Sequence, residues 1–188
     1  YVTGEESLEQ LAIRARRLGL SVEGLSVATE TRAQAIANHI SATSPDIVII
    51  DSIQVMQIES LDSTPGSVSQ VRETAAYFTR LAKTRGVVIV LVGHITKEGG
   101  LAGPKVLEHM IDCFMMLESP AASRFRTLRA IKNRFGAVNE LGVFAMTEHG
   151  MKEIINPSAI FLEKGESSAP GSAITVIWEG TRPMLIEI

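Results

Sequence analysis

The sequence is poor in cysteine and carries little net charge, and each shortage excludes a class of protein. A single cysteine, Cys113, among 188 residues excludes a disulfide framework and a cysteine-rich zinc module within these residues. The formal net charge of −3 argues against a globally basic nucleic-acid binder. Apolar runs such as Val87–Val92 are far shorter than the roughly 20 residues that a bilayer-spanning helix needs. We therefore expect a globular protein of the reducing cytoplasm that makes no membrane contact.

A phosphate-binding loop of the form G-x-x-x-x-G-K-[ST] is also missing from the sequence. Such a loop holds the phosphates of a nucleotide with its backbone amides and its lysine, so these residues alone are not expected to hydrolyse one. Tyr1–Thr3 has the β-branched pattern of the end of a strand, and Leu185–Ile188 stops inside a strand-like run. We therefore expect a fragment of a longer chain, with the missing loop upstream of Tyr1.

Alternating strand-like and helix-like segments predict an α/β fold. Ile47–Asp51 and Val87–Val92 are continuous aliphatic runs, which are typical of parallel strands buried on both faces. Ser7 and Gln10 have the spacing of a capping box at the start of the first helix. The other predicted segments are helices over 8–18, 32–42 and 68–85, the last ended by Gly86, and a short strand over 25–28. Together they predict a mostly parallel sheet flanked by helices.

The pattern changes in the last third of the chain. Cys113–Leu117, Phe125–Lys132 and Leu141–Met146 are strand-like runs joined by short polar turns, which favours antiparallel strands added to the sheet. Breaker residues then cluster before two further strand-like runs. These changes predict a first domain over residues 1–152, and a linker with the first strands of a second domain over 153–188.

Polar and charged side chains follow three predicted strands and define a candidate catalytic site. They are Glu5 after the first strand, Asp51 and Ser52 after the aliphatic run, and His94 after the next strand. Parallel strands share their carboxyl edge, where an Asp can steer Mg²⁺, a Glu can polarise water and a His can sense a phosphate. Each charged residue also has a structural alternative: a turn or cap for Asp51, a hydrogen-bonded structural role for His94, and a helix start for Glu5.

A basic segment from Arg124 to Gly136 holds five cations and no acid. Strand alternation predicts one cationic face, formed by Arg124, Arg126, Lys132 and Arg134, and one apolar face. Lys132 and Arg134 would then project in parallel about 7 Å apart, a spacing that suits a phosphate group. The alternative is the solvated face of an edge strand, on which cations discourage pairing with other chains.

Three further cations are candidate DNA contacts. Lys97 and Lys105 lie in a glycine-rich loop after the second aliphatic strand, and Arg72 lies at the start of the long helix. Lysines in such loops can track a nucleic-acid backbone, although loops without a ligand have the same composition. No aromatic residue is interleaved with them, so stacking on bases is not expected.

Several motifs together resemble the bacterial RadA (Sms) family. The pentapeptide from Lys132 to Gly136, K-N-R-F-G, is the hallmark of that family. The motifs that accompany it are Tyr1–Ser7, Ile49–Gln54, Gly66–Glu73 and Leu101–His109. The resemblance runs along the whole chain. It implies a RecA-like P-loop ATPase that forms a hexameric ring around single-stranded or branched DNA and acts beside a RecA-type recombinase in recombination and repair.

The resemblance also implies roles for individual residues. Glu5 matches the water-activating glutamate of RecA-like cores, and Glu6 is the alternative candidate for this role. Asp51 matches the Walker B aspartate, which holds Mg²⁺ indirectly, and Ser52 would contact the bound ATP beside it. His94 matches the position that couples the nucleotide to a DNA-binding loop.

Lys132 and Arg134 match paired fingers that enter the ATP site of a neighbouring subunit, so hydrolysis would need an oligomer. The family also has a four-cysteine zinc finger before the ATPase core, which assigns Zn²⁺ only to a missing N-terminal region. It has a Lon-protease-like domain after the core, and residues 153–188 resemble its beginning.

Three hypotheses of function stay open at this point. The first is a DNA-dependent motor ATPase that extends strand exchange and moves branch points. The second is an ATP-gated DNA-binding ring scaffold or recombinase accessory, and the third is a nucleotide-switched sensor of circadian-clock type. Stimulation of ATP hydrolysis by DNA would favour the motor over the sensor. Hydrolysis that persists without Arg134 would favour the scaffold over the motor.

Overall fold

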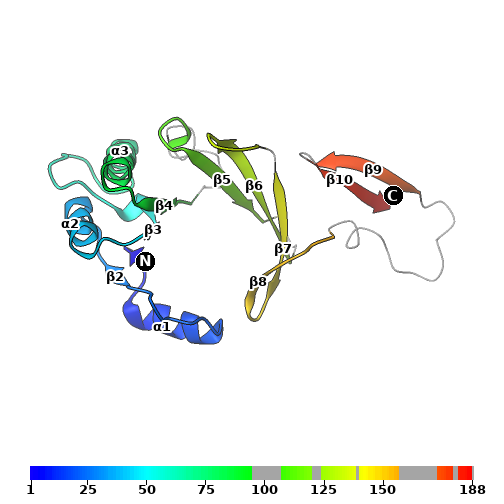
Figure 1. Ribbon diagram of the computed structural model, residues 1–188, viewed down its shortest axis with the longest axis horizontal. Helices are drawn as coiled ribbons and strands as arrows, with labels where there is room; N and C mark the ends of the chain where they lie inside the picture. The colour runs from blue at the N-terminus through cyan, green and yellow to red at the C-terminus, as the bar shows by residue number, and fades with distance from the viewer. Residues whose placement is uncertain (95–106, 120–123, 139, 157–172, 180–181, 188) are drawn as a thin grey trace. The chain divides into compact units, whose positions relative to one another are not determined.

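A computed structural model describes all residues except 95–106, 120–123, 139, 157–172, 180–181 and 188 (Figure 1). The chain forms two compact units, Tyr1–Ile111 and Asp112–Ile188. The elements of the first unit are β1 (Val2–Thr3), α1 (Leu8–Arg17), β2 (Ala28–Thr29), α2 (Ala33–Thr43), β3 (Ile47–Asp51), the 3₁₀ turn η1 (Ile53–Val55), α3 (Val68–Arg85) and β4 (Val88–Val92). The predicted α/β class is confirmed.

The first unit is built on a parallel sheet with the strand order β2-β1-β3-β4. In the sheet, Asp51 at the end of β3 is in register with Thr3 of β1 and with Val92 of β4. The predicted strand Ile47–Asp51 is confirmed with its bounds. This register brings the carboxyl ends of three neighbouring strands to one edge of the sheet.

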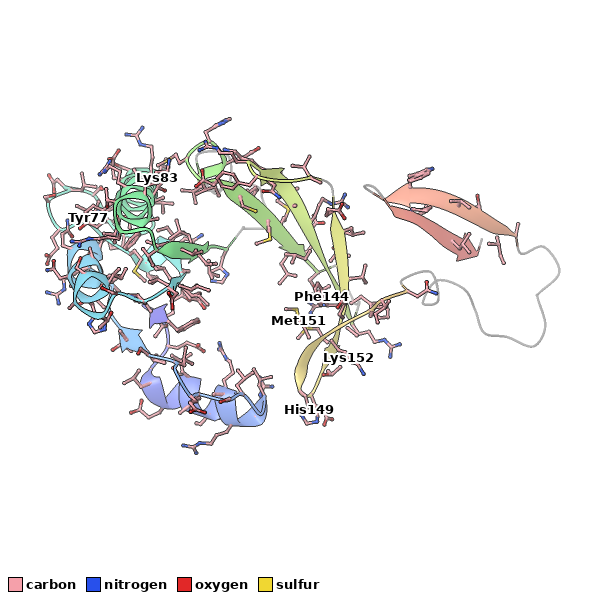
Figure 2. All side chains as sticks on the ribbon, viewed as in Figure 1. Tyr77, Lys83, Phe144, His149, Met151 and Lys152 are labelled. Carbon is pink, nitrogen blue, oxygen red and sulfur yellow. The ribbon has the colours of Figure 1, made fainter. Side chains whose placement is uncertain are left out.

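The helices α2 and α3 cover one face of this sheet. The side chains that they bury with β3 are Ile36, Ile40, Val71, Ala75 and Phe78 from the helices, and Val48 and Ile50 from the strand. Tyr77 of α3, labelled in Figure 2, is the neighbour of Phe78 along the helix. The two rings meet edge-on, with their centroids 5.8 Å apart. The core of the unit therefore lies between β3 and two helices.

The opposite face of the sheet is apolar and exposed, contrary to the prediction that both faces are covered. Ile47 of β3 is 60% exposed, and Val88 and Val90 of β4 are 57% and 41% exposed. Ile47 is in register with Val88, and Ile49 with Val90, so these side chains share one face. The prediction was wrong because α1 buries no residue, while α2 and α3 both pack on the other face.

The helix ends follow the predicted local signals. The hydroxyl of Ser7 accepts a hydrogen bond from the backbone N–H of Gln10, and the side chain of Gln10 accepts one from the N–H of Ser7, which closes the predicted capping box. Gly86 ends α3 with a φ of +66°, a left-handed conformation that favours glycine. No helix in the described part of the chain is long and apolar enough to cross a bilayer.

The second unit contains an antiparallel sheet with the order β5-β6-β7-β8 and a separate hairpin. Its strands are β5 (Cys113–Glu118), β6 (Phe125–Asn133), β7 (Leu141–Thr147), β8 (Gly150–Glu153), β9 (Ile174–Glu179) and β10 (Arg182–Glu187). The predicted antiparallel pairing of β5, β6 and β7 is confirmed. The prediction that these strands are added to the parallel sheet was wrong, because among the described strands they pair only with one another and with β8 and form a sheet of their own. The division at residue 153 stays a prediction, because it concerns likeness to known domains, whereas the two units are defined by their internal contacts.

Val71→Ala and Val68→Ala form a matched pair, because the same two methyl groups leave a buried and an exposed position of α3. Val71 is 2% exposed and Val68 is 50% exposed. We expect Val71→Ala to lower the free energy of unfolding by about 2 kcal/mol and Val68→Ala by less than about 0.5 kcal/mol. Urea unfolding of the chain measures both values. Equal losses would contradict the packing of α3 on the sheet.

Candidate functional site

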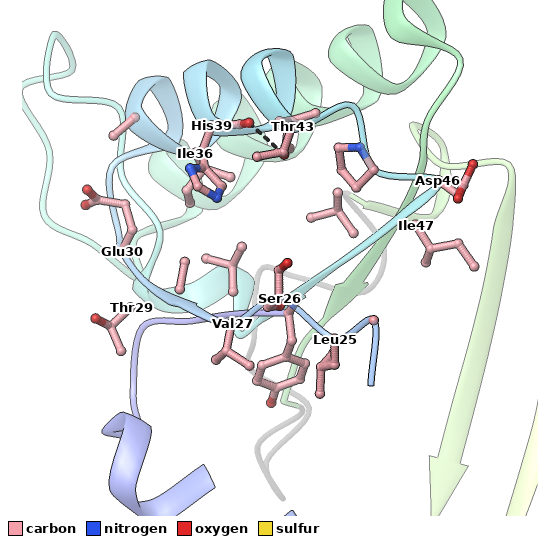
Figure 3. A pocket seen from close by; sticks show the side chains of 18 residues that line it. Leu25, Ser26, Val27, Thr29, Glu30, Ile36, His39, Thr43, Asp46 and Ile47 are labelled. Atoms are coloured by element: carbon pink, nitrogen blue, oxygen red, sulfur yellow. Dashed lines mark hydrogen bonds between the residues drawn. The ribbon is translucent and has the colours of Figure 1, made fainter. Parts of the chain in front are cut away.

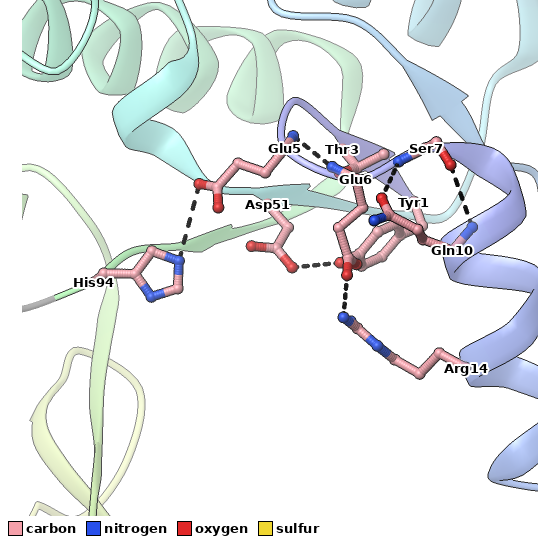
Figure 4. A network of polar contacts seen from close by, with 9 residues as sticks. All are labelled: Tyr1, Thr3, Glu5, Glu6, Ser7, Gln10, Arg14, Asp51 and His94. Atoms are coloured by element: carbon pink, nitrogen blue, oxygen red, sulfur yellow. Dashed lines mark hydrogen bonds and ion pairs between the residues drawn. The ribbon is translucent and has the colours of Figure 1, made fainter.

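Side chains from the ends of β1, β3 and β4 meet at the carboxyl edge of the parallel sheet (Figure 4). In the turn after β1, the hydroxyl of Thr3 accepts hydrogen bonds from the backbone N–H groups of Glu5 at 3.2 Å and Glu6 at 3.0 Å. The N–H of Gly4 donates to the carbonyl of Asp51 at 3.0 Å. The turn that carries Glu5 is therefore tied to the end of β3.

Glu5 lies at the centre of this group. Its Oε1 accepts a hydrogen bond from the hydroxyl of Ser52, a fully buried residue. The same oxygen lies 4.0 Å from Nε2 of His94, a contact that becomes an ion pair only when the imidazole is protonated. Two predicted site residues, Ser52 after β3 and His94 after β4, thus converge on the carboxylate of a third, Glu5 after β1.

Asp51 lies beside them, and its carboxylate accepts a hydrogen bond from the phenol of Tyr1 (Figure 4). Burial raises the pKa of Tyr1, and the bond to Asp51 raises it further. Glu6, the alternative candidate to Glu5, forms an ion pair with Arg14 instead. No sequence pattern marks Tyr1, because an aromatic residue in a strand is ordinary.

Gln54 connects the turn after β3 to the end of β4. Its Nε2 donates to the backbone carbonyl of His94 at 2.9 Å, and a Cβ added to Gly93 would lie 3.4 Å from the same nitrogen. Oε1 of Gln54 is buried and has no hydrogen-bond partner within the described residues. The amide therefore anchors the backbone of His94 to the segment that follows Asp51. Sequence patterns do not reveal this bond, which spans 40 residues.

Asp51, Glu5 and Ser52 supply the hard oxygen donors that Mg²⁺ prefers. No group of three His, Cys, Asp or Glu side chains in the described ranges could hold a metal by itself. Mg²⁺ in nucleotide sites is held by one or two carboxylates together with waters and phosphates. The donor set therefore fits an ion that is shared with a nucleotide.

The basic pentapeptide lies in the second unit and contacts its own chain. Nη1 of Arg134 lies 2.7 Å from Oδ1 of Asp112, in an ion pair that lacks hydrogen-bond alignment. The backbone N–H of Arg134 donates to the carbonyl of Asp112 at 2.9 Å. Asp112 therefore holds the turn after β6, and the roles of Lys132 and Arg134 toward ATP stay predictions.

A β-bulge in β6 changes the predicted alternation of the basic side chains. The pairs around it are Phe114–Lys132, Met115–Ala130 and Met116–Arg129. Ile131 is the extra residue between the first two pairs. Lys132 consequently shares a face with Arg129 and not with Arg126. The predicted single cationic face was wrong, because one unpaired residue inverts the two-residue period.

Of the three candidate DNA contacts, Arg72 lies within the described residues, and Lys97 and Lys105 lie outside them. The guanidinium of Arg72 is 2.8 Å from the carboxylate of Glu73, and its side chain is 59% exposed. Ion pairs between exposed neighbours are weak, so this pair does little to fix the Arg72 side chain, and its role toward DNA stays a prediction.

A cavity of about 630 Å³ opens at the amino end of β1 and β3, lined also by β2 and α2 (Figure 3). His39 and Ile47 are among its lining residues, as is Glu30. Hydrogen bonds from Arg32 lower the pKa of Glu30 to about 2. The lining of the cavity contains none of Glu5, Asp51, Ser52 and His94, but it includes Tyr1, whose hydroxyl bonds to Asp51.

Known proteins resemble the chain along its entire length. It is 62% identical over all 188 residues to the DNA repair protein RadA of Escherichia coli. It is 60% and 49% identical to the proteins of the same name from Haemophilus influenzae and Bacillus subtilis, again over all 188 residues. The chain belongs to the RadA family. It spans about 41% of the length of these relatives, and no family model matches it.

Membership of the RadA family confirms the resemblance that the motifs indicated. The K-N-R-F-G pentapeptide and the segments around Glu5 and Asp51 all fall inside the shared 188 residues. These relatives extend well beyond the 188 residues that they share with the chain. The shared segment therefore establishes the family and not the activity of a whole RadA-family protein.

Gln54→Met in this RadA-family chain removes the donor to His94 and keeps the length of the side chain. We expect it to lower the free energy of unfolding by about 1 kcal/mol, the usual net value of one hydrogen bond. Gln57→Met is the matched control, because the side chain of Gln57 makes no hydrogen bond within the part of the chain that is described. Urea unfolding compares the two variants. If Gln54→Met is as stable as the wild-type protein, a water molecule replaces the hydrogen bond that the amide donates to His94.

Proposed function

We propose that this chain is part of a DNA-stimulated ATPase of homologous recombination and DNA repair, a ring-shaped motor on single-stranded or branched DNA. The observation that carries the proposal is the meeting of Glu5, Ser52 and His94 at the carboxyl ends of adjacent parallel strands, with Asp51 beside them. That edge of an open α/β sheet is where nucleotides bind. The relatives' shared name, DNA repair protein RadA, supports the biological role.

The proposed fold of the complete core is RecA-like. β4 pairs only with β3 among the described strands, so its outer edge can receive a further parallel strand. The loop after such a strand would reach the same edge as Asp51 and His94, and we assign the missing phosphate-binding loop to that position. A helix after the loop would cover the exposed face that contains Ile47 and Val88.

The proposed chemistry is attack of a water on the terminal phosphate of ATP, in which the new P–O bond replaces the bond to ADP, the leaving group. Glu5 accepts the proton of that water, and the bond from Ser52 fixes the direction of its carboxylate. His94, 4.0 Å from Glu5, is placed to respond to the same phosphate and to pass the state of the nucleotide to the segment after β4. Mg²⁺ bound near Asp51 would supply neutralisation of the phosphate charge.

We assign to Lys132 and Arg134 contacts with ATP in the neighbouring subunit of a homo-hexamer. A cation in that position stabilises the charge that develops on the transferred phosphoryl group. Arg134 must first leave Asp112, but the two side chains are 50% and 37% exposed, so breaking the pair costs little. A head-to-tail contact in which each subunit serves the next closes naturally into a ring.

The ion pair between Arg134 and Asp112 also favours a second function, an ATP-gated DNA-binding ring scaffold or recombinase accessory. An Arg134 that stays with Asp112 stabilises the turn after β6 and takes no part in hydrolysis. ATP would then control assembly of the ring without driving movement. The two functions differ in what Arg134 does, which makes this residue the one to test.

The proposed cofactors are ATP and Mg²⁺, and Zn²⁺ is assigned only to a finger outside these residues. The proposed partners are single-stranded or branched DNA, a RecA-type recombinase and further copies of the protein. Residues 153–188 are assigned to the start of a Lon-protease-like domain.

Mixing two variants of the full-length protein tests the ring motor. Glu5→Gln removes the proton acceptor and Arg134→Ala removes the finger, and we expect each to lower DNA-stimulated ATP hydrolysis at least about 100-fold. Glu5→Gln keeps its nucleotide binding. An equimolar mixture regains hydrolysis, because Glu5 of an Arg134→Ala subunit then meets Arg134 of a Glu5→Gln subunit. ATP hydrolysis with and without single-stranded DNA is the measurement.

Arg124→Ala is the matched control, since Arg124 belongs to the same basic segment but packs 5.1 Å from the ring centre of Phe125. We expect it to keep DNA-stimulated hydrolysis. Hydrolysis that survives Arg134→Ala would favour the scaffold over the motor. Hydrolysis that is indifferent to DNA would contradict a DNA motor altogether.

Arg72→Ala tests the proposed DNA surface. We expect the slope of log affinity against log salt concentration to fall by about one unit, because one phosphate contact is lost. Arg85→Ala is the control, because Arg85 lies at the other end of α3. Fluorescence anisotropy of a labelled oligonucleotide at several KCl concentrations gives both slopes. An unchanged slope for Arg72→Ala would remove this residue from the DNA surface.

A further inference from the structure

The hydrogen bond between Tyr1 and Asp51 joins the residue before β1 to the end of β3, and no step of the chemistry proposed above uses it. Thr3 is in register with Asp51, and Tyr1 directly precedes β1 with its carbonyl accepting a hydrogen bond from the N–H of Ala28. Tyr1 lies two residues before Thr3 in this extended backbone, so its side chain points to the same face of the sheet as Asp51. From that position the hydroxyl of Tyr1 donates to Oδ2 of Asp51 (Figure 4). Both residues are partly buried, which limits competition from water.

The bond leaves the other carboxylate oxygen of Asp51, Oδ1, for a further ligand. A carboxylate held at one oxygen cannot rotate freely, so the direction of Oδ1 is set before a ligand arrives. Glu6 is the other acid whose charge acts on the phenol, and Arg14 holds it in an ion pair. Asp51 is therefore the acceptor that the local arrangement offers to Tyr1.

We propose that Tyr1 is a positioning residue whose hydroxyl aims Asp51 at a divalent cation bound together with a nucleotide. This inference rests on the proposed ATPase function and deepens it. Hydrogen-bond partners of metal-holding side chains contribute about 10- to 100-fold to metal affinity. Tyr1→Phe keeps the ring and its packing and removes only the donor, so it isolates this contribution.

The test measures Mg²⁺-dependent binding of a fluorescent N-methylanthraniloyl-ATP to the full-length protein, a readout that needs no hydrolysis. We expect Tyr1→Phe to raise the Mg²⁺ concentration for half-maximal binding about 10-fold or more. Nucleotide binding in EDTA stays unchanged, and hydrolysis at saturating Mg²⁺ returns close to the wild-type rate. Tyr77→Phe is the matched control, since Tyr77 is the other tyrosine of the chain and lies against Phe78 on α3.

Asp51→Asn completes a double-mutant cycle. If Tyr1 acts through Asp51, Tyr1→Phe has no further effect on the Mg²⁺ dependence of the Asp51→Asn protein. A full additional loss would show that Tyr1 acts through another group and would overturn the inference. A lowered melting temperature of Tyr1→Phe with unchanged Mg²⁺ dependence would overturn it too, because Tyr1 would then be structural.

Two different failures can be told apart. A wild-type protein whose nucleotide binding ignores Mg²⁺ contradicts the proposed ATPase, and this inference with it. If nucleotide binding by the wild-type protein depends on Mg²⁺ and Tyr1→Phe leaves that dependence unchanged, the role of Tyr1 is overturned and the proposed ATPase stays intact.

Discussion

The register of the parallel sheet, in which Asp51 lies between Thr3 and Val92, aligns the carboxyl ends of three strands. A slip of one residue would turn Asp51 to the face that the helices cover and would scatter the polar groups of the site. The burial of Val48 and Ile50 against α2 and α3 opposes such a slip. The core and the candidate site are therefore products of one constraint.

The parts of the fold with local causes were predictable from the sequence. The strand Ile47–Asp51 follows from its aliphatic run, and the caps at Ser7 and Gly86 follow from side-chain and backbone chemistry within a few residues. The coverage of the sheet was not predictable, because long-range packing decides which face a helix meets. The bulge at Ile131 was equally hidden, because an aliphatic residue also fits a regular strand.

The candidate site divides in the same way. Glu5, Asp51 and His94 were predictable, because parallel strands share a carboxyl edge whatever connects them. Tyr1 and Gln54 were not, because their bonds span 50 and 40 residues and neither side chain has a distinctive sequence context. Strand ends in the sequence thus indicate the groups that can react. The residues that hold those groups in place depend on distances that only the folded chain creates.

The strand β4 combines two properties that folded proteins usually keep apart. It lies at the edge of its sheet in the described part of the chain, and its Val88 and Val90 are exposed. Open N–H and C=O groups along such a β-branched strand are a template for pairing with another copy. The net charge of −3 offers little electrostatic repulsion against this. The edge of β4 is therefore one place at which copies of the segment in isolation would pair edge to edge.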